Sequence, residues 1–142
     1  MNDATLVPEL IRRESRTFLQ YVRESYPWAH GVGDTAHRGR VMAMADEESA
    51  EIGKIGRALQ RRHIPLPFLG AFPSGFTTSN FLAVSFVIPK LAATLRHDIA
   101  ELEPLVRTIA DAELRAQFEA YVETKRRHLR ELEADAAPPQ AA

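Results

Sequence analysis

The sequence contains no cysteine among its 142 residues. Disulfide bonds, thiolate metal sites and cysteine nucleophiles are therefore excluded. Long apolar runs are missing as well, and the longest, from Phe81 to Ile88, is far too short to span a bilayer. The opening residues, MNDATLVPELIRRE, contain no basic stretch followed by an apolar segment, so no secretion signal is predicted and a cytoplasmic location is expected.

An excess of charge of one sign is also absent. The 18 Lys and Arg residues nearly balance the 19 Asp and Glu residues, which leaves a net charge of −1. There is thus no electrostatic reason to expect nucleic acid or an acidic membrane as a partner. The serines lack the G-x-S-x-G context of a hydrolase nucleophile, and the seven glycines form no phosphate-binding loop.

Amphipathic helical periodicity is what the sequence does contain. Its 45% apolar and 26% charged residues are typical of one globular domain. Apolar residues that recur three and four positions apart predict four helices, over about 6–26, 40–63, 78–108 and 111–134. A loop rich in glycine and polar residues is predicted over 27–39. Thr78 or Ser79 is expected to cap the third helix, and Asp111 the fourth.

A proline-rich segment separates the second and third predicted helices. It has the sequence IPLPFLGAFPSGFTT over 64–78, and its three prolines and two glycines are typical of an extended chain. Fifteen extended residues reach roughly 45–50 Å, more than the roughly 33 Å length of a helix of about 22 residues. The third helix is therefore expected to run parallel to the second, as in the ferritin-like variant of the four-helix bundle. We predict this all-α fold for 1–136 and a disordered tail for 137–142.

This connector and the residues after it carry four phenylalanines, Phe68, Phe72, Phe76 and Phe81. One interpretation is that their rings pack along the groove between the helices. The other is that they form a partly exposed surface for a second copy of the chain or for another protein. A homodimer is expected on the second interpretation.

Each predicted helix carries an ionisable residue inside its apolar stripe. These residues are Glu14 on the first helix, Glu48 with Glu51 one turn later on the second, Asp98 on the third, and Lys125 with His128 on the fourth. Charged groups on an apolar face are unfavourable unless they find a partner. Because all of them lie near the middle of their helices, they can meet at one level of a bundle.

This set resembles the di-iron carboxylate site of the ferritin and rubrerythrin superfamily. That site takes a carboxylate from the first and third helices and a Glu-x-x-His pair from the second and fourth. Glu14 and Asp98 match the single carboxylates, while ESAE (48–51) has glutamate in place of histidine and KRRH (125–128) has lysine in place of glutamate. The resemblance implies a site for iron or manganese that reacts with oxygen or peroxide, with Glu14, Glu48, Glu51, Asp98 and His128 as ligands.

Lys125 argues against a two-metal enzyme. Its ammonium repels cations, offers no lone pair and stands where the family has a metal-bridging glutamate. The four carboxylates sum to −4 and Lys125 adds +1, so at most one divalent ion beside a neutral His128 is expected. The alternative is a metal-free salt-bridge network, in which Glu14 and Glu48 face Lys125 and a protonated His128, inside a non-catalytic interaction or assembly protein. The sequence leaves both interpretations open.

Overall fold

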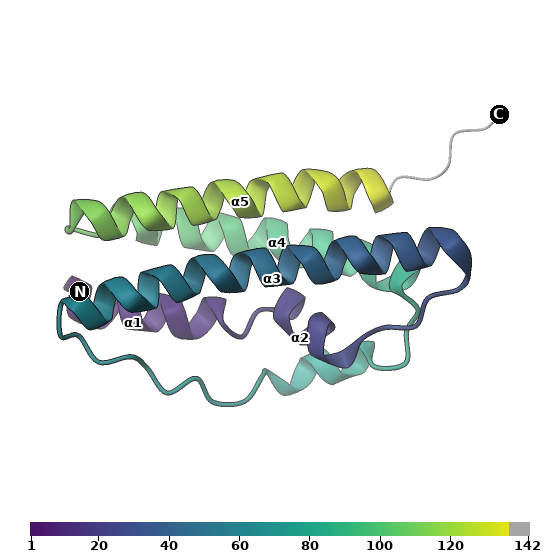
Figure 1. Cartoon of the computed structure of the whole chain (residues 1–142), viewed down its shortest axis with the longest axis horizontal. Coiled ribbons are helices and arrows are strands. Elements are labelled where there is room, and N and C mark those ends of the chain that lie inside the picture. Colours follow the sequence, from purple (N-terminus) through teal and green to yellow (C-terminus); the bar gives the residue numbers. More distant parts are fainter. Residues whose placement is uncertain (137–142) are drawn as a thin grey trace.

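The computed structural model describes residues 1–136, and the disordered tail predicted for 137–142 lies outside the described residues. The described part is all-helical and contains no strand, which confirms the predicted class. Its elements are α1 (Asp3–Glu14), α2 (Phe18–Ser25), α3 (Gly31–Arg61), the 3-10 helix η1 (Ser74–Ser79), α4 (Val84–Arg107) and α5 (Ala112–Ala136). The longer helices run along the long axis of the molecule (Figure 1). None of the helices in this part of the chain has the length and apolar character that crossing a membrane requires.

The first predicted helix, 6–26, is in fact two helices. α1 ends at Glu14, and the Ser15 hydroxyl after it donates a hydrogen bond back to the α1 backbone at 2.7 Å. Thr17 is extended, with φ −72° and ψ 164°, and its hydroxyl oxygen accepts from the backbone N–H of Gln20 at 3.3 Å. This side chain caps the start of α2 and satisfies an otherwise unpaired amide. The prediction of one continuous helix is therefore wrong at these residues.

The helix α3 begins earlier than predicted. Gly31 is its first residue, so the loop predicted over 27–39 is wrong from this point onward. The first nine residues of α3 include three glycines, which weaken a helix and account for the error. The Asp34 carboxylate accepts a hydrogen bond from the backbone N–H of His30 at 3.0 Å and holds this start in place. α3 ends at Arg61, close to its predicted end.

Residues 62–83 form the connector, which returns along the length of the molecule. Figure 1 shows this segment running from the left end past α1 and α2 to the right end, after which α4 follows the same direction as α3. The Arg16 guanidinium donates to the Gly70 carbonyl at 2.9 Å and fastens the connector to the helices. Phe72 and Phe76 place their rings against α2. These two rings therefore pack on the helices.

The helix α4 starts later than predicted. Thr78 and Ser79 lie in η1, so the prediction that one of them caps the third helix is wrong. α4 begins at Val84, after an extended Ala83 with φ −70° and ψ 155°. The Val84 N–H donates to the Trp28 carbonyl at 2.7 Å, and Trp28 pairs with Ala83 in an isolated β-bridge. This long-range contact keeps the chain extended up to the start of α4.

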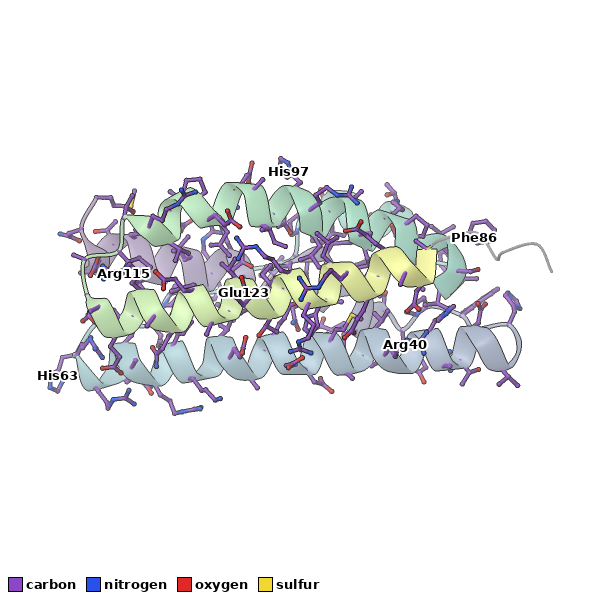
Figure 2. The ribbon with its side chains drawn as sticks, turned by 90° about the horizontal axis from the view of Figure 1, so that it is seen from above. Arg40, His63, Phe86, His97, Arg115 and Glu123 are labelled. Atoms are coloured by element: carbon purple, nitrogen blue, oxygen red, sulfur yellow. The ribbon has the colours of Figure 1, made fainter. Side chains whose placement is uncertain are left out.

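The fourth predicted helix corresponds to α5, including its cap. The Asp111 carboxylate accepts from the backbone N–H groups of Glu113 and Leu114 at 3.0 and 3.1 Å. In Figure 2, α5 lies over the seam between α3 and α4, and it packs against both. The apolar stripes of the helices meet in one core. Lys125 and His128 are buried in the same interior.

Candidate functional site

The side chain of Lys125 lies at the centre of a buried ionic cluster, which we define as Glu14, Glu48, Tyr121, Lys125 and His128. Lys125 is 0% exposed. Its Nζ donates to Glu14 Oε1 at 2.5 Å and lies 3.5 Å from Glu48 Oε1. The Tyr121 hydroxyl donates to the same Glu14 oxygen at 2.9 Å. The cluster therefore joins α1, α3 and α5.

His128 extends the cluster toward the surface. Its Nδ1 lies 2.6 Å from Glu48 Oε2, and its Nε2 lies 2.7 Å from Glu47 Oε1. Glu47 is half-buried and forms a second ion pair with Arg127 at 2.5 Å. A neutral imidazole has only one N–H donor, whereas the protonated ring has two. Carboxylates facing both ring nitrogens therefore indicate an imidazolium.

The surroundings of these groups fix their protonation states. Burial lowers the pKa of the Lys125 ammonium, but attraction to Glu14 and Glu48 outweighs burial and raises this pKa above its usual range. Burial also lowers the pKa of His128, and its hydrogen bonds to two glutamates outweigh that effect and raise it. Burial raises the pKa of the Tyr121 phenol, and the nearby carboxylates raise it further. These contacts therefore favour an ammonium, an imidazolium and an un-ionised phenol in the cluster.

The structure brings three of the five predicted ligands together, namely Glu14, Glu48 and His128. Asp98 on α4 is only half-buried, and burial raises its pKa against the opposing pull of Lys125. Glu51 is also half-buried, accepts a hydrogen bond from the Thr124 hydroxyl at 2.9 Å, and has a pKa raised by burial. These two carboxylates border the cluster instead of contacting Lys125.

The sequence interpretation does not include two side chains that contact the cluster, Glu47 and Tyr121. Glu47 lies at the edge of the α3 stripe, next to a glutamate that was identified. The opposite charges of EESAE on α3 and KRRH on α5 are the pattern that could have identified it, because facing helices pair such segments. Tyr121 occupies an apolar position, and a buried tyrosine hydroxyl usually finds a partner. The sequence contains no other indication that Tyr121 contacts the cluster.

A surface cavity of about 410 Å³ opens at the break between α1 and α2. Glu14, Thr17 and Asp98 contribute to its lining. A second cavity of only about 10 Å³ is lined by residues that include Asp98 and Lys125, and it has space for about one water molecule. The break between the two helices thus brings solvent close to the Glu14 side of the cluster.

The side chains present do not fit a divalent cation in this arrangement. The Lys125 ammonium contacts two carboxylates, and both nitrogens of His128 face carboxylates, so no imidazole lone pair is free. Across residues 1–136, no group of three or more His, Cys, Asp or Glu side chains is placed to hold a metal ion. Iron or manganese binding therefore stays a prediction from the resemblance, without support from the donor geometry.

The protonation states also limit the chemistry of the cluster. A protonated Lys125 has no lone pair with which to attack an electrophile, and an un-ionised Tyr121 is not a base. The Glu14 carboxylate already accepts two hydrogen bonds on one oxygen. The contacts of the buried ionic cluster pair its charges in the interior.

Comparison with known proteins identifies no relative. No protein-family model, no curated protein and no solved structure matches the chain. What the protein does must therefore be inferred from the geometry and charge of its own residues.

Proposed function

We propose that this chain is a non-catalytic helical-bundle protein that serves interaction or assembly, and that its buried ionic cluster is structural. We further propose a ferritin-like architecture, in which α1 and α2 together take the place of the first helix. The full-length connector supports this architecture, because it lets α3 and α4 run in the same direction (Figure 1). In that architecture Lys125 takes the position of a metal-bridging glutamate.

The charge balance of the interior is the observation that carries this proposal. The two buried carboxylates, Glu14 and Glu48, contribute −2. Lys125 and the protonated His128 contribute +2, so the sum is zero without a metal ion. A divalent cation would have to displace the ammonium from the carboxylates that hold it, in an interior where an unpaired charge is strongly unfavourable.

Metal loading tests the proposal. The protein is incubated with iron(II) or manganese(II) without oxygen, desalted and analysed for bound metal. We expect less than about 0.1 equivalent per chain and an unchanged melting temperature, because a ligand that does not bind the folded state cannot stabilise it. Retention of about one equivalent together with a higher melting temperature would show that the cluster is a metal site.

A double variant provides the positive control for metal loading. Lys125→Glu combined with Glu51→His restores the Glu-x-x-His pattern of the resembled family on both α3 and α5. We expect this variant to retain metal under the same conditions. Lys54→Glu makes a matching charge change at an exposed position of α3 and should retain none. If the double variant keeps its helical circular dichroism but binds no metal, the ferritin-like assignment is wrong.

The second candidate function is binding of a single iron or manganese ion. One observation favours it: among the described residues, the buried Glu51 Oε2 has no hydrogen-bond partner, and Glu48 Oε1 has only the 3.5 Å ion pair with Lys125. Buried acceptors without partners are unfavourable, and a cation would satisfy them. Glu14, Asp98 and His128 would then supply the remaining ligands. Metal retained by the wild-type protein selects this candidate over the structural one.

We also propose that a second copy of the chain is one partner. On the connector, Phe68 is 90% exposed and Leu66 is 48% exposed. Large apolar side chains exposed in this way favour contact with another protein surface. The net charge of −1 gives no support to a nucleic acid or a membrane as partner, and a cytoplasmic location stays a prediction.

A further inference from the structure

A surface cavity of about 390 Å³ lies between the end of α2, with the residues that follow it, and the end of the connector. The rings of Tyr21, Tyr26, Trp28 and Phe81 contribute to its lining, together with Glu24. We call it the aromatic cavity. Trp28 is the only tryptophan of the chain. None of these residues belongs to the buried ionic cluster, so the aromatic cavity is a separate feature of the molecule.

Long-range contacts hold the walls of the aromatic cavity together. The β-bridge between Trp28 and Ala83 ties the residues after α2 to the end of the connector. The Tyr21 hydroxyl donates to Asn80 Oδ1 at 2.5 Å and joins α2 itself to the connector. The rings are thus positioned by contacts between segments far apart in the sequence, and such contacts give a pre-formed binding surface.

Two of the aromatic residues have a backbone conformation that bulky residues rarely adopt. The φ angle is 50° at Tyr26 and 71° at Phe81, both in the left-handed region. Burial does not compensate for this strain, because Tyr26 is 56% exposed and Phe81 is 85% exposed. At Tyr26 the left-handed conformation is that of an ordinary helix C-cap, because this residue ends α2. At Phe81, which lies outside the helices, strained backbone that presents a ring to solvent is typical of a surface that contacts a ligand.

The charges around the aromatic cavity indicate which ligand fits. Among the described residues that line it, Glu24 alone carries a carboxylate. Two cations lie nearby without lining it: the Arg38 guanidinium is 4.2 Å from the Tyr26 ring centroid, and the Lys90 Nζ donates to Ser79 Oγ at 2.9 Å. The Arg38 guanidinium already occupies a face of the Tyr26 ring, which leaves Trp28 and Phe81 as the rings for a ligand. Both positive charges repel any cation, so binding depends on contact with the rings and on the charge of Glu24, and this favours a large apolar cation over a small hydrated one.

We propose that the aromatic cavity binds an organic cation that carries a methylated ammonium group, such as trimethylammonium. The rings of Trp28 and Phe81 contact the methyl groups, and Glu24 supplies the opposite charge. Aromatic rings attract such a cation through their quadrupoles in addition to apolar contact. This binding is independent of the proposed function, because it does not involve the buried cluster or its metal content.

Choline and its neutral isostere 3,3-dimethylbutanol test the proposal. The two molecules have the same shape and differ in the charge of the central atom. Because Trp28 is the only tryptophan, its fluorescence reports on the cavity directly. We expect a saturable fluorescence change with choline and at least about tenfold weaker binding of dimethylbutanol. Equal affinities, or no saturable change with choline, would show that the proposal is wrong.

A matched pair of glutamate variants tests the role of charge. Glu24→Gln keeps the shape of the side chain and removes its charge, so choline affinity should fall about fivefold to tenfold while dimethylbutanol binding is unchanged. Glu131→Gln makes the same change at an exposed position of α5 and should alter choline affinity by less than about twofold. If both variants lost the same amount of choline affinity, choline would be attracted by acidic surface in general, and the proposal would fail.

Phe81→Gly separates binding from stability. Glycine adopts a φ angle of 71° freely, so this substitution removes one ring and relieves the backbone strain. We expect a melting temperature at or above that of the wild type, with choline affinity reduced about fivefold. A lower melting temperature with unchanged affinity would assign Phe81 a purely structural role and would overturn the proposal.

Discussion

A fully buried ammonium such as that of Lys125 has lost its water, and only nearby negative charge keeps its charged form stable. Glu14 and Glu48 provide that charge, and both of these carboxylates are buried as well. Each partner therefore depends on the others. Removing one of them leaves an uncompensated charge in the interior, which is more harmful than removing a whole pair.

The substitution Lys125→Met is expected to lower the free energy of unfolding by about 3–5 kcal/mol, because it leaves the buried Glu14 without a cation and Glu48 with His128 alone. Methionine has a similar volume, so the lost charge and not a cavity dominates the effect. Urea unfolding followed by circular dichroism measures it. The matched variant Lys54→Met, at an exposed lysine of α3, should change stability by less than about 0.5 kcal/mol. A loss equally small at Lys125 would mean that its ammonium is hydrated in solution.

The protonation of His128 is expected to make stability depend on pH. Burial lowers the pKa of His128, but hydrogen bonds to Glu48 and Glu47 raise it above its ordinary value of 6.5. The folded protein therefore keeps a proton that the unfolded chain releases above about pH 6.5. The stabilisation from this proton is complete below that pH and is lost as the pH rises through the folded-state pKa. Urea unfolding between about pH 6 and about pH 9 should show the decrease.

Two histidine variants isolate this effect. His128→Gln removes the titrating ring, so the decrease in stability with rising pH should become shallower than in the wild type. His97→Gln removes an exposed histidine that points away from the helices in Figure 2, and it should leave the decrease unchanged. An equally steep decrease in His128→Gln would assign the pH dependence to another group.

At the scale of helices, the break between α1 and α2 depends on the cap that Thr17 provides. Thr17→Ala is expected to lower the free energy of unfolding by about 1 kcal/mol, because the backbone N–H of Gln20 loses its hydrogen-bond partner. Thr17→Ser keeps the hydroxyl and loses only a methyl group, so it should retain most of that stability. Thermal unfolding of both variants measures the difference. Equal losses in Ala and Ser would attribute the effect to packing of the methyl group.

The helices show what periodicity can and cannot predict. Apolar spacing identifies α4 and α5 well, because each buries a continuous stripe over many turns. It does not reveal the break before Thr17, since the stripe continues across both helices and the break depends on local side-chain hydrogen bonds. Apolar spacing also fails to predict where α3 and α4 begin. The start of α3 at Gly31 depends on the Asp34 hydrogen bond to the backbone. The start of α4 at Val84 depends on the bridge between Trp28 and Ala83.

At the scale of the whole molecule, the exposed connector is expected to bring two chains together. One chain has a mass of 15.9 kDa, so size-exclusion chromatography with light scattering should give twice that value, about 32 kDa. Phe68→Asp should shift the protein to the mass of one chain. Val32→Asp makes the same kind of change at a residue that is 89% exposed at the start of α3 and should leave the dimer intact. A wild-type mass of one chain would contradict the dimer.

The sequence predicts the residues of the site that lie at the centre of a helix face, but not those at its edge. Glu14, Glu48 and His128 meet because each lies at the centre of a buried stripe, where a modest rotation of the helix cannot expose it. Asp98 and Glu51 lie nearer the edges of their stripes, and there a small rotation decides between a contact with Lys125 and contact with solvent. Side-chain partners at such edges depend on tertiary packing, which the sequence pattern alone does not specify.

Lys125 and His128 stand almost one turn apart on α5, opposite carboxylates that come from two other helices. Sliding α5 along its axis by one turn, about 5.4 Å, would put Leu129 and Leu132 where the two cations now lie. At other interior positions the shift would exchange one apolar side chain for another, such as Phe118 for Leu114, at a smaller energetic cost. The carboxylates would not tolerate the shift, since leucine leaves them unpaired. The most polar residues of the interior therefore restrict α5 to a single longitudinal position, which the apolar residues alone would not do.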